Sequence, residues 1–152
     1  MNLSLKNLEE TRKLGMAIGA EIRPGDVIGL VGDLGAGKTA LTRAIAEGMC
    51  IPSPLMVTSP TFVLINEYPT TPPLYHFDFY RLKSASELLE IGFEEYIESD
   101  GVCVIEWADR FESLLPQDRL MISLNVTGES TREAILTSFG DRPREFLESL
   151  KE

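Results

Sequence analysis

The amino-acid sequence predicts an α/β protein whose sheet contains both parallel and antiparallel strands. Two apolar runs, at residues 26–31 and 102–106, do not alternate polar with apolar residues. That pattern is typical of strands buried on both faces of a parallel sheet. Two further pairs of strand-like segments are joined by short polar connections, which favours antiparallel pairing. Because a strictly alternating βαβ chain would not need such pairs, we expect a mixed sheet.

The first third of the chain predicts a helix, a strand, a loop and a second helix. Asn7 can cap a helix and is followed three residues later by Glu, the spacing of a capping box. A rough apolar stripe continues that helix for about four turns. A Pro-Gly turn then leads into the buried strand 26–31, the glycine-rich stretch 32–37 is predicted to be a loop, and residues 38–49 continue as a helix.

The rest of the chain predicts two antiparallel pairs on either side of a buried strand. The connection at 69–73 is polar, rich in proline and short enough to join neighbouring antiparallel strands. The expected elements are strands 61–68 and 74–79, a helix at 84–90, a second helical piece after a break at Gly92, the buried strand 102–106, a hairpin of strands 120–126 and 133–139, and a helix at 142–150.

The length and the apolar pattern favour a single cytoplasmic domain. The chain has 152 residues, which fits one domain, and we expect residues 1–152 to form it. The first residues lack the apolar stretch and cleavage site of a signal peptide. No apolar run approaches the roughly 18 residues that a membrane span needs.

The composition argues against two kinds of binding site. The chain has 14 basic and 24 acidic residues, a formal net charge of −10. A protein that grips RNA alone usually presents a basic face, because phosphate contacts provide much of the affinity. Any RNA in its biology should therefore be held by another protein. Cys50 and Cys103 lack metal-ligand spacing, so we expect two small buried apolar side chains and no structural zinc site.

The segment 32–39 has the strongest functional signal in the sequence. It reads Gly-Asp-Leu-Gly-Ala-Gly-Lys-Thr and matches G-x-x-x-x-G-K-[ST] in full, between a predicted strand and a predicted helix. Its glycines let backbone N–H groups point at phosphate oxygens, and the helix start adds its positive dipole end. Lys38 is expected to reach the β- and γ-phosphates and Thr39 to offer its hydroxyl to magnesium. The sequence therefore predicts a magnesium nucleotide site in a P-loop NTPase-like three-layer fold with a mixed parallel/antiparallel sheet.

Two carboxylates at strand ends are candidate partners of the metal, because magnesium needs further oxygen ligands. Glu106 ends the apolar run 102–105, where P-loop proteins usually have an acidic residue; the alternative is a solvated residue at a strand end. Asp78 lies between two phenylalanines, and a carboxylate in an aromatic strand needs a partner. We expect it to serve the metal or orient the attacking water. The alternative is a pair with Arg81 or with a loop N–H.

Three neighbouring residues have more than one interpretation. His76, the only histidine, points to the same face of its strand as Asp78. We interpret it as a structural histidine, with a general base as the alternative. The hydroxyls at 58–61, including Thr61, either sense the γ-phosphate as a switch segment does or belong to a loop that enters a strand. Trp107 either fills the core, which we favour, or stacks on a ligand.

Four motifs in order make the chain resemble the bacterial TsaE family, also called YjeE, the ATPases of tRNA threonylcarbamoyladenosine synthesis. They are Gly-Asp-Leu-Gly-Ala-Gly-Lys-Thr at 32–39, Ser-Pro-Thr-Phe at 59–62, His-Phe-Asp-Phe-Tyr-Arg at 76–81 and Ile-Glu-Trp at 105–107. A phosphate loop alone would be weak evidence for a family. The spacer lengths and the total size also fit, so the resemblance covers nearly the whole chain.

The resemblance implies a set of site residues for ATP and Mg²⁺. Asp78 matches a functionally required aspartate, Thr61 a switch-like threonine and Trp107 the tryptophan beside the metal site. The catalytic residues expected on this basis are Asp78, Lys38 and Glu106. The expected metal ligands are Thr39, Glu106 and Asp78. The residues expected at the nucleotide are Asp33, Leu34, Gly35, Ala36, Gly37, Lys38, Thr39, Ala40, Thr61 and Trp107.

The resemblance also implies partners and a role. The protein would bind and hydrolyse ATP while docked on the TsaD and TsaB proteins, and so support repeated transfer of threonylcarbamoyl to the adenosine next to the anticodon of tRNAs. TsaD would perform the transfer, and tRNA would be met only through the complex. We expect weak hydrolysis by the isolated chain, because the sequence offers no clear arginine finger, although Arg81 is a candidate. Adenine contacts are expected near Thr11 and Arg132.

Two other function classes are compatible with the phosphate loop. A small-molecule or nucleoside kinase would transfer phosphate to an alcohol or a nucleotide instead of water, but the chain has no arginine cluster from which to build a lid. A nucleotide-dependent interaction module would not hydrolyse ATP at all. It predicts that changing Asp78 leaves ATP turnover untouched even when partners are present.

Overall fold

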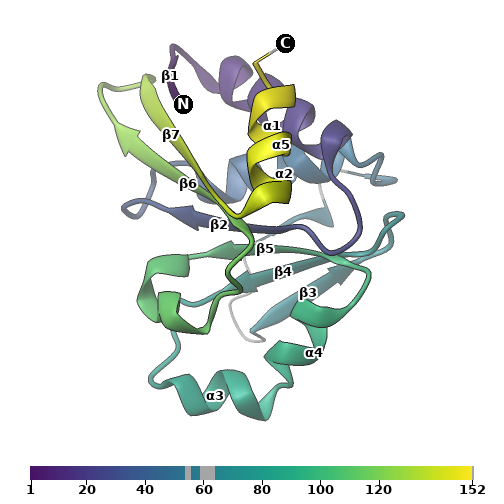
Figure 1. Ribbon diagram of the computed structural model, residues 1–152. Helices are drawn as coiled ribbons and strands as arrows, with labels where there is room; N and C mark the ends of the chain where they lie inside the picture. Colours follow the sequence, from purple (N-terminus) through teal and green to yellow (C-terminus); the bar gives the residue numbers. More distant parts are fainter. Residues whose placement is uncertain (54–55, 59–63, 152) are drawn as a thin grey trace.

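Helices cover both faces of a seven-stranded sheet in the computed structural model of the protein, which describes residues 1–53, 56–58 and 64–151 (Figure 1). The strand order is β1-β7-β6-β2-β5-β4-β3. The strands are β1 (Asn2–Leu5), β2 (Val27–Val31), β3 (Ile65–Tyr68), β4 (Leu74–Asp78), β5 (Val102–Glu106), β6 (Arg119–Val126) and β7 (Arg132–Phe139). The helices are α1 (Leu8–Glu21), α2 (Lys38–Gly48), α3 (Ala85–Glu90), α4 (Phe93–Glu98), the 3-10 segment η2 (Ala108–Leu114) and α5 (Asp141–Ser149).

The mixed α/β sheet predicted from the sequence is confirmed. β2 pairs in parallel with β5 and with β6, and β4 pairs in parallel with β5. The two predicted antiparallel pairs are β3 with β4 and β6 with β7. The predicted strand 61–68 begins at Ile65 in the structure, and the first part of that prediction, at 61–63, lies outside the described residues.

Strand β1 was not predicted. It pairs antiparallel with β7, and the terminal ammonium of Met1 donates to the carbonyl of Leu136 over 3.0 Å. The segment has only four residues, too few for alternation to stand out in the sequence. Its conformation is stabilised by a neighbour more than 120 residues away in the chain, which local patterns do not reveal.

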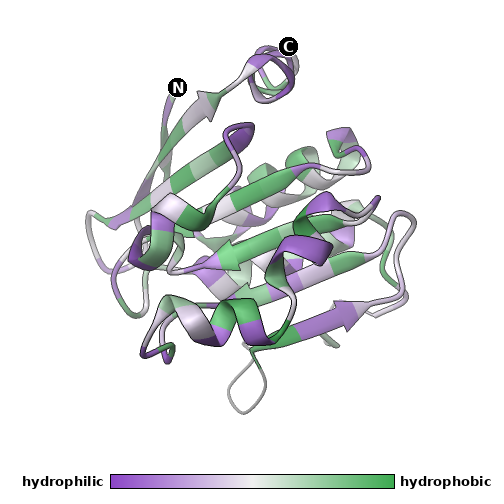
Figure 2. Ribbon diagram, turned by 60° about the horizontal axis from the view of Figure 1, so that its bottom comes forward, coloured by the Kyte–Doolittle hydropathy of each residue, from purple (hydrophilic) through white to green (hydrophobic). Residues whose placement is uncertain are grey.

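Side-chain alternation along the central strands divides the core into two clusters. In β4, His76 and Asp78 face the side of the sheet covered by α1 and α2, whereas Phe77 faces α3 and α4. The first cluster joins α1, α2 and α5 to the sheet, and the second joins α3, α4 and η2 to it. Figure 2 shows the central strands as largely hydrophobic ribbons between these layers.

Helices α1 and α2 pack closely because glycines lie at their contact. A Cβ atom added at Gly19 would lie 2.1 Å from the carbonyl oxygen of Ile45, and one added at Gly15 would lie 2.3 Å from the Cβ of Ala44. Neither approach leaves room for a side chain. These glycines therefore set how near α1 comes to α2, the helix that follows the phosphate loop.

Replacing Gly19 with Ala is expected to lower the free energy of unfolding by roughly 1–3 kcal/mol, the usual cost of overpacking. Alanine in a helix interior is normally favoured over glycine by about 0.5–1 kcal/mol, so the clash has to outweigh that gain. Urea denaturation measures the difference. Ala17→Gly, at an exposed position of the same helix, measures the difference in helix propensity between alanine and glycine without a clash. A Gly19→Ala protein as stable as the original would contradict this packing.

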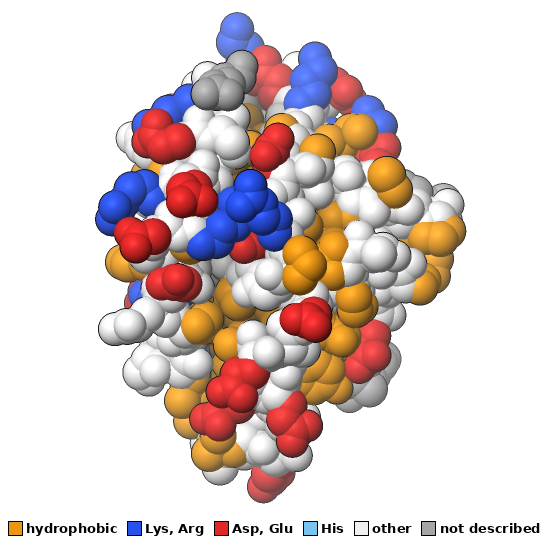
Figure 3. All heavy atoms as spheres, turned by 45° about the vertical axis from the view of Figure 1, so that its right-hand side comes forward, with side chains coloured by type: hydrophobic (Ala, Val, Ile, Leu, Met, Phe, Trp, Pro, Cys, Tyr) orange, Lys and Arg blue, Asp and Glu red, His pale blue; other side chains and the backbone are white. Residues whose placement is uncertain are grey.

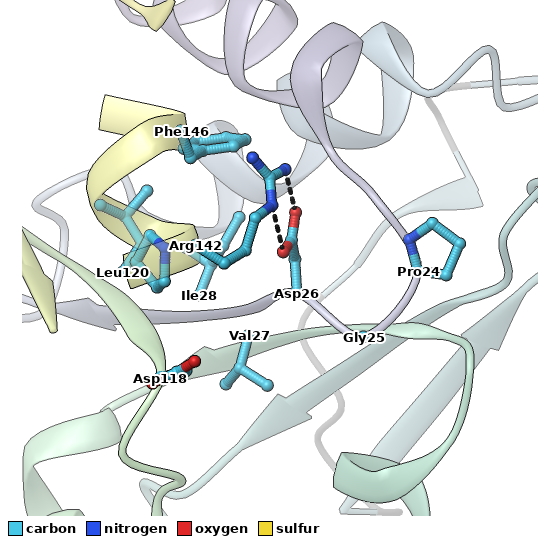
Figure 4. A pocket seen from close by; sticks show the side chains of 10 residues that line it. Pro24, Gly25, Asp26, Val27, Ile28, Asp118, Leu120, Arg142 and Phe146 are labelled. Atoms are coloured by element: carbon cyan, nitrogen blue, oxygen red, sulfur yellow. Dashed lines mark hydrogen bonds and ion pairs between the residues drawn. The ribbon is translucent and has the colours of Figure 1, made fainter. Parts of the chain in front are cut away.

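Helix α5 is fixed to the amino end of β2 by a paired arginine. Arg142 donates from Nε to Asp26 Oδ1 over 3.1 Å and from Nη2 to Asp26 Oδ2 over 2.8 Å. Figure 4 shows this pair in the wall of a cavity of about 150 Å³, together with Phe146 and Leu120. The cavity lies at the end of β2 opposite the phosphate loop. The arginine in its wall, Arg142, is already paired with Asp26.

The two cysteines differ in a way the sequence did not predict. Cys103 is buried in β5, as expected, and burial raises the pKa of its thiol to about 12. The prediction for Cys50 is wrong, because its side chain is exposed. It occupies the left-handed position that ends α2, with φ of 63°, and its N–H donates to Glu47 while that of the buried Ile51 donates to Ala46. This helix-ending turn directs residue 50 outward and residue 51 inward.

Candidate nucleotide site

The glycine-rich loop runs from the end of β2 to the start of α2. Gly37 precedes the helix with φ of 105°, a left-handed conformation that favours glycine. Gly32 lies against β6, where an added Cβ would be 2.6 Å from the carbonyl oxygen of Leu124. Gly37 provides no side-chain cap for α2, and the positive end of the helix dipole at this position favours an anion.

Lys38 lies with its ammonium enclosed by the loop. Its Nζ donates to the carbonyl of Gly32 over 2.6 Å and to that of Asp33 over 2.9 Å, and it lies 4.2 Å from the ring centre of Trp107. The residue is only 5% exposed, and burial lowers the pKa of its amine. A phosphate would compete with two carbonyls and an indole face for this cation, all weaker partners than an anion.

A chain of hydrogen bonds connects α2, β5 and β4 behind the loop. The hydroxyl of Thr39 lies 3.0 Å from Glu106 Oε1 and 3.2 Å from Oε2. On its other side, Glu106 Oε2 lies 2.5 Å from His76 Nε2. Glu106 is 3% exposed and His76 is fully buried. The solvated strand-end alternative for Glu106 is therefore wrong, and both carboxylate oxygens are fixed beside Thr39.

Asp78 lies next to Glu106 in the parallel register of β4 and β5. Its Oδ1 accepts a hydrogen bond from the N–H of Tyr80 over 2.9 Å, the loop N–H that the sequence left open as a partner. The structure gives no ion pair between Asp78 and Arg81, both of which lie in its described part. Burial is the main cause of a raised pKa at Asp78, and the charge of Glu106 adds to it.

Trp107 is only partly in the core. It packs at the edge of the second cluster, yet its ring lies 4.9 Å from that of Tyr80 and faces Lys38. The favoured core prediction is therefore correct for one side of the indole, and the other side belongs to the site. Tyr80 was not predicted as a site residue, although it lies within the 76–81 motif, two residues after Asp78.

A cavity of about 350 Å³ lies in front of these groups. Nine of the predicted site residues line it: Leu34, Gly35, Gly37, Lys38, Thr39, Ala40, Asp78, Glu106 and Trp107. Tyr80 and Arg81 complete the wall. The other three predicted residues are not among the described residues that line it. The carbonyl of Asp33 accepts a hydrogen bond from Lys38, Ala36 is buried, and Thr61 lies outside the described residues.

A second hollow of about 200 Å³ lies on the other side of the phosphate loop. Thr11 and Arg132, the residues at which adenine contacts were predicted, both line it together with Gly35 and Gly37. Arg132 Nε donates to the carbonyl of Ala36 over 3.2 Å. The two residues are therefore brought together beside the loop, and their contact with adenine stays a prediction.

The donor set at the loop fits magnesium. Thr39 and Glu106 offer hard oxygen atoms in contact with each other, and Asp78 is their neighbour in the sheet register. In the described part of the chain, no group of three or more His, Cys, Asp or Glu residues is able to hold a metal ion alone. Magnesium is usually bound by one or two carboxylates together with substrate phosphates and water, so this arrangement suits it.

Because Trp107 is the only tryptophan, its fluorescence should report nucleotide binding. An ammonium group 4.2 Å from the indole centre is expected to move toward the bound phosphates, which changes the electrostatic environment of the ring. Titration with the magnesium nucleotide should therefore give a saturable change in emission. Trp107→Phe should remove the signal, and an unchanged spectrum in a sample that binds nucleotide by calorimetry would contradict the expected movement.

A family model and the similar proteins of known name all point to one family. Residues 5–134 match the family model described as threonylcarbamoyl adenosine biosynthesis protein TsaE. The Bacillus subtilis tRNA threonylcarbamoyladenosine biosynthesis protein TsaE is 44% identical over 95% of this chain and 89% of its own length. The protein of the same name from Treponema pallidum is 39% identical over 84% of this chain and 93% of its own.

Similarity to a solved structure extends over almost the whole fold. The crystal structure of Bacillus subtilis YdiB superposes with a TM-score of 0.82 at 38% identity, and the match covers 99% of this chain and 93% of that one. Among the described residues, no helix is both long enough and apolar enough to cross a membrane.

Proposed function

This chain belongs to the TsaE family, and we propose that it is an ATP-binding and ATP-hydrolysing protein that acts in tRNA threonylcarbamoyladenosine biosynthesis. The observation that supports this most strongly is the contact between Thr39 of the phosphate loop helix and Glu106 at the end of β5, with Asp78 beside them. Three oxygen-bearing side chains next to a phosphate loop are what magnesium-assisted phosphoryl transfer requires.

Different residues bind the phosphates, hold the metal and act on the attacking water. The loop N–H groups and Lys38 bind the phosphates, and Thr39 and Glu106 hold Mg²⁺, which when bound neutralises charge on the transferring phosphoryl group. Asp78 borders the same cavity, and its carboxylate is a group that can accept a proton. It orients the attacking water and accepts a proton from it.

Partner proteins supply the contact with tRNA in this proposal. Acidic side chains gather over α3 and α4, in the lower part of Figure 3, and no Lys or Arg occurs between Lys83 and Arg110. Such a surface repels RNA phosphates. We therefore place the chain on the TsaD and TsaB proteins, with TsaD performing the transfer. Family membership supports this role over that of a small-molecule kinase.

Steady-state ATP hydrolysis by the purified chain, alone and with TsaD and TsaB added, tests the proposal. We expect slow hydrolysis by the chain alone and clear stimulation by the two partners, lost in Lys38→Ala. ATP binding without stimulated hydrolysis would support the alternative that the chain is a nucleotide-dependent interaction module. Transfer of phosphate to an added alcohol or nucleoside would instead support the kinase alternative.

A further inference from the structure

His76 is a polar residue in an apolar part of the sheet. It lies in β4 between Leu74 and Asp78 on the face that α1 and α2 cover, and none of its surface is exposed. Its register partner on β5 is Val104, which is also fully buried. A histidine at such a position forgoes the hydration of two ring nitrogens, so an apolar side chain would suit the packing better unless the imidazole contributes a specific contact.

Only one ring nitrogen has such a contact among the described residues. Nε2 lies 2.5 Å from Glu106 Oε2, and because an ionised carboxylate only accepts, Nε2 carries the hydrogen. Nδ1 is buried and has no hydrogen-bond partner in the described part of the chain. Leaving Nδ1 unsatisfied is unfavourable, so among the described residues the contact of Nε2 with Glu106 is the polar interaction that offsets the burial of the ring.

The contact fixes the carboxylate that serves the magnesium site. Glu106 is held from β4 by His76 at Oε2 and from α2 by Thr39, whose hydroxyl is 3.0 Å from Oε1. P-loop proteins offer this hydroxyl to magnesium, so its bond to Glu106 changes when metal binds. The contact from His76 comes from a sheet strand and does not depend on that exchange.

We propose that His76 is a positioning residue that holds Oε2 of Glu106, so that Oε1 stays beside the Thr39 hydroxyl where the magnesium nucleotide binds. The inference rests on the proposed function and adds to it a residue outside the nucleotide cavity, which His76 does not line. Groups that orient a metal-binding side chain in this way typically change metal affinity by about 10–100-fold when replaced.

Two amide substitutions separate positioning from packing. In His76→Gln the side-chain nitrogen lies as many bonds from Cβ as Nε2 does, so it reaches Glu106. In His76→Asn the nitrogen lies one bond nearer, at the position of Nδ1, and does not reach. Both variants are polar and smaller than histidine, so both should destabilise the fold to a similar extent, which thermal unfolding checks.

The readout is the gain in ATP affinity caused by Mg²⁺, measured by isothermal titration calorimetry with magnesium and with EDTA. We expect His76→Asn to lose roughly 10–100-fold of this gain, His76→Gln to keep most of it, and both to bind ATP in EDTA as the original protein does. In a Glu106→Gln background, His76→Asn should cause no further loss, because its effect acts through Glu106.

Different results separate failure of the inference from failure of the proposed function. If the original protein binds no ATP, or gains nothing from Mg²⁺, the proposed magnesium nucleotide site is wrong. If the original protein gains affinity from Mg²⁺ and His76→Asn gains as much, the positioning role is wrong. Equal losses in the Gln and Asn variants, or a further loss in the Glu106→Gln background, would make His76 a packing residue and overturn the inference.

Discussion

Replacing Lys38 with Ala is expected to weaken ATP binding by roughly 10–100-fold, because each charge-assisted hydrogen bond to phosphate contributes about 1.5–3 kcal/mol. The ammonium is enclosed by the loop, within 2.9 Å of two carbonyls that a phosphate would replace. No other lysine or arginine among the described residues holds these two carbonyls. Isothermal titration calorimetry with the magnesium nucleotide measures the loss.

Lys13 offers a matched control for this prediction. It is an exposed lysine on α1, so Lys13→Ala removes the same charge from the whole protein without touching the loop. We expect it to bind ATP as the original protein does. Equal weakening by both substitutions would mean that the overall charge, and not the position of the ammonium, determines affinity.

Replacing Asp78 with Asn is expected to leave ATP binding nearly unchanged and to lower partner-stimulated hydrolysis by about 10²-fold or more, the usual contribution of a general base. The amide keeps the size of the side chain and an oxygen that can accept from the N–H of Tyr80, as Asp78 does over 2.9 Å. It cannot accept the proton of water. The ratio of the two steady-state rates, with TsaD and TsaB present, measures the effect.

The same variant should not be less stable than the original at neutral pH. Burial raises the pKa of Asp78 in the folded protein, so the folded state binds its proton more tightly than the unfolded state does. The ionised carboxylate therefore costs stability, and this cost grows as pH rises through the range between the two pKa values. Asp78→Asn removes it, so the variant should unfold at an equal or higher urea concentration at pH 7. The difference should vanish below about pH 3.9, the ordinary pKa of aspartate, where both states are protonated.

Asp100 provides the control for Asp78. It is exposed after the end of α4, so Asp100→Asn should change neither hydrolysis nor the dependence of stability on pH. If Asp78→Asn hydrolyses ATP at the original rate with partners present, the aspartate is not the residue that acts on water. Another group would then have to orient the attacking water and accept its proton.

Much of the fold and the site could be predicted because their determinants are local. The segment 32–39 requires glycine where the backbone takes a left-handed turn at Gly37, and such requirements are visible in one chain. Alternation in β4 correctly predicted that His76 and Asp78 share a face. The lack of alternation in 102–106 correctly predicted a strand that is buried on both faces.

What the sequence could not supply depends on distant contacts. The bond between His76 and Glu106 joins residues 30 positions apart and follows from the parallel register of β4 with β5, which no local pattern determines. Strand β1 exists only through β7. The exposure of Cys50 depends on how α2 ends, and cysteine is generally buried, so composition suggested the opposite.

The most direct test of the proposed role is the amount of threonylcarbamoyladenosine formed in tRNA when TsaD and TsaB are limiting. The reaction contains a threonylcarbamoyl donor, ATP and unmodified tRNA, and the modified nucleoside is quantified after digestion. We predict more than one modification per TsaD molecule with this chain present, and no such excess without it or with Lys38→Ala. The same yield with and without the chain would contradict the proposal that its ATP cycle supports repeated transfer.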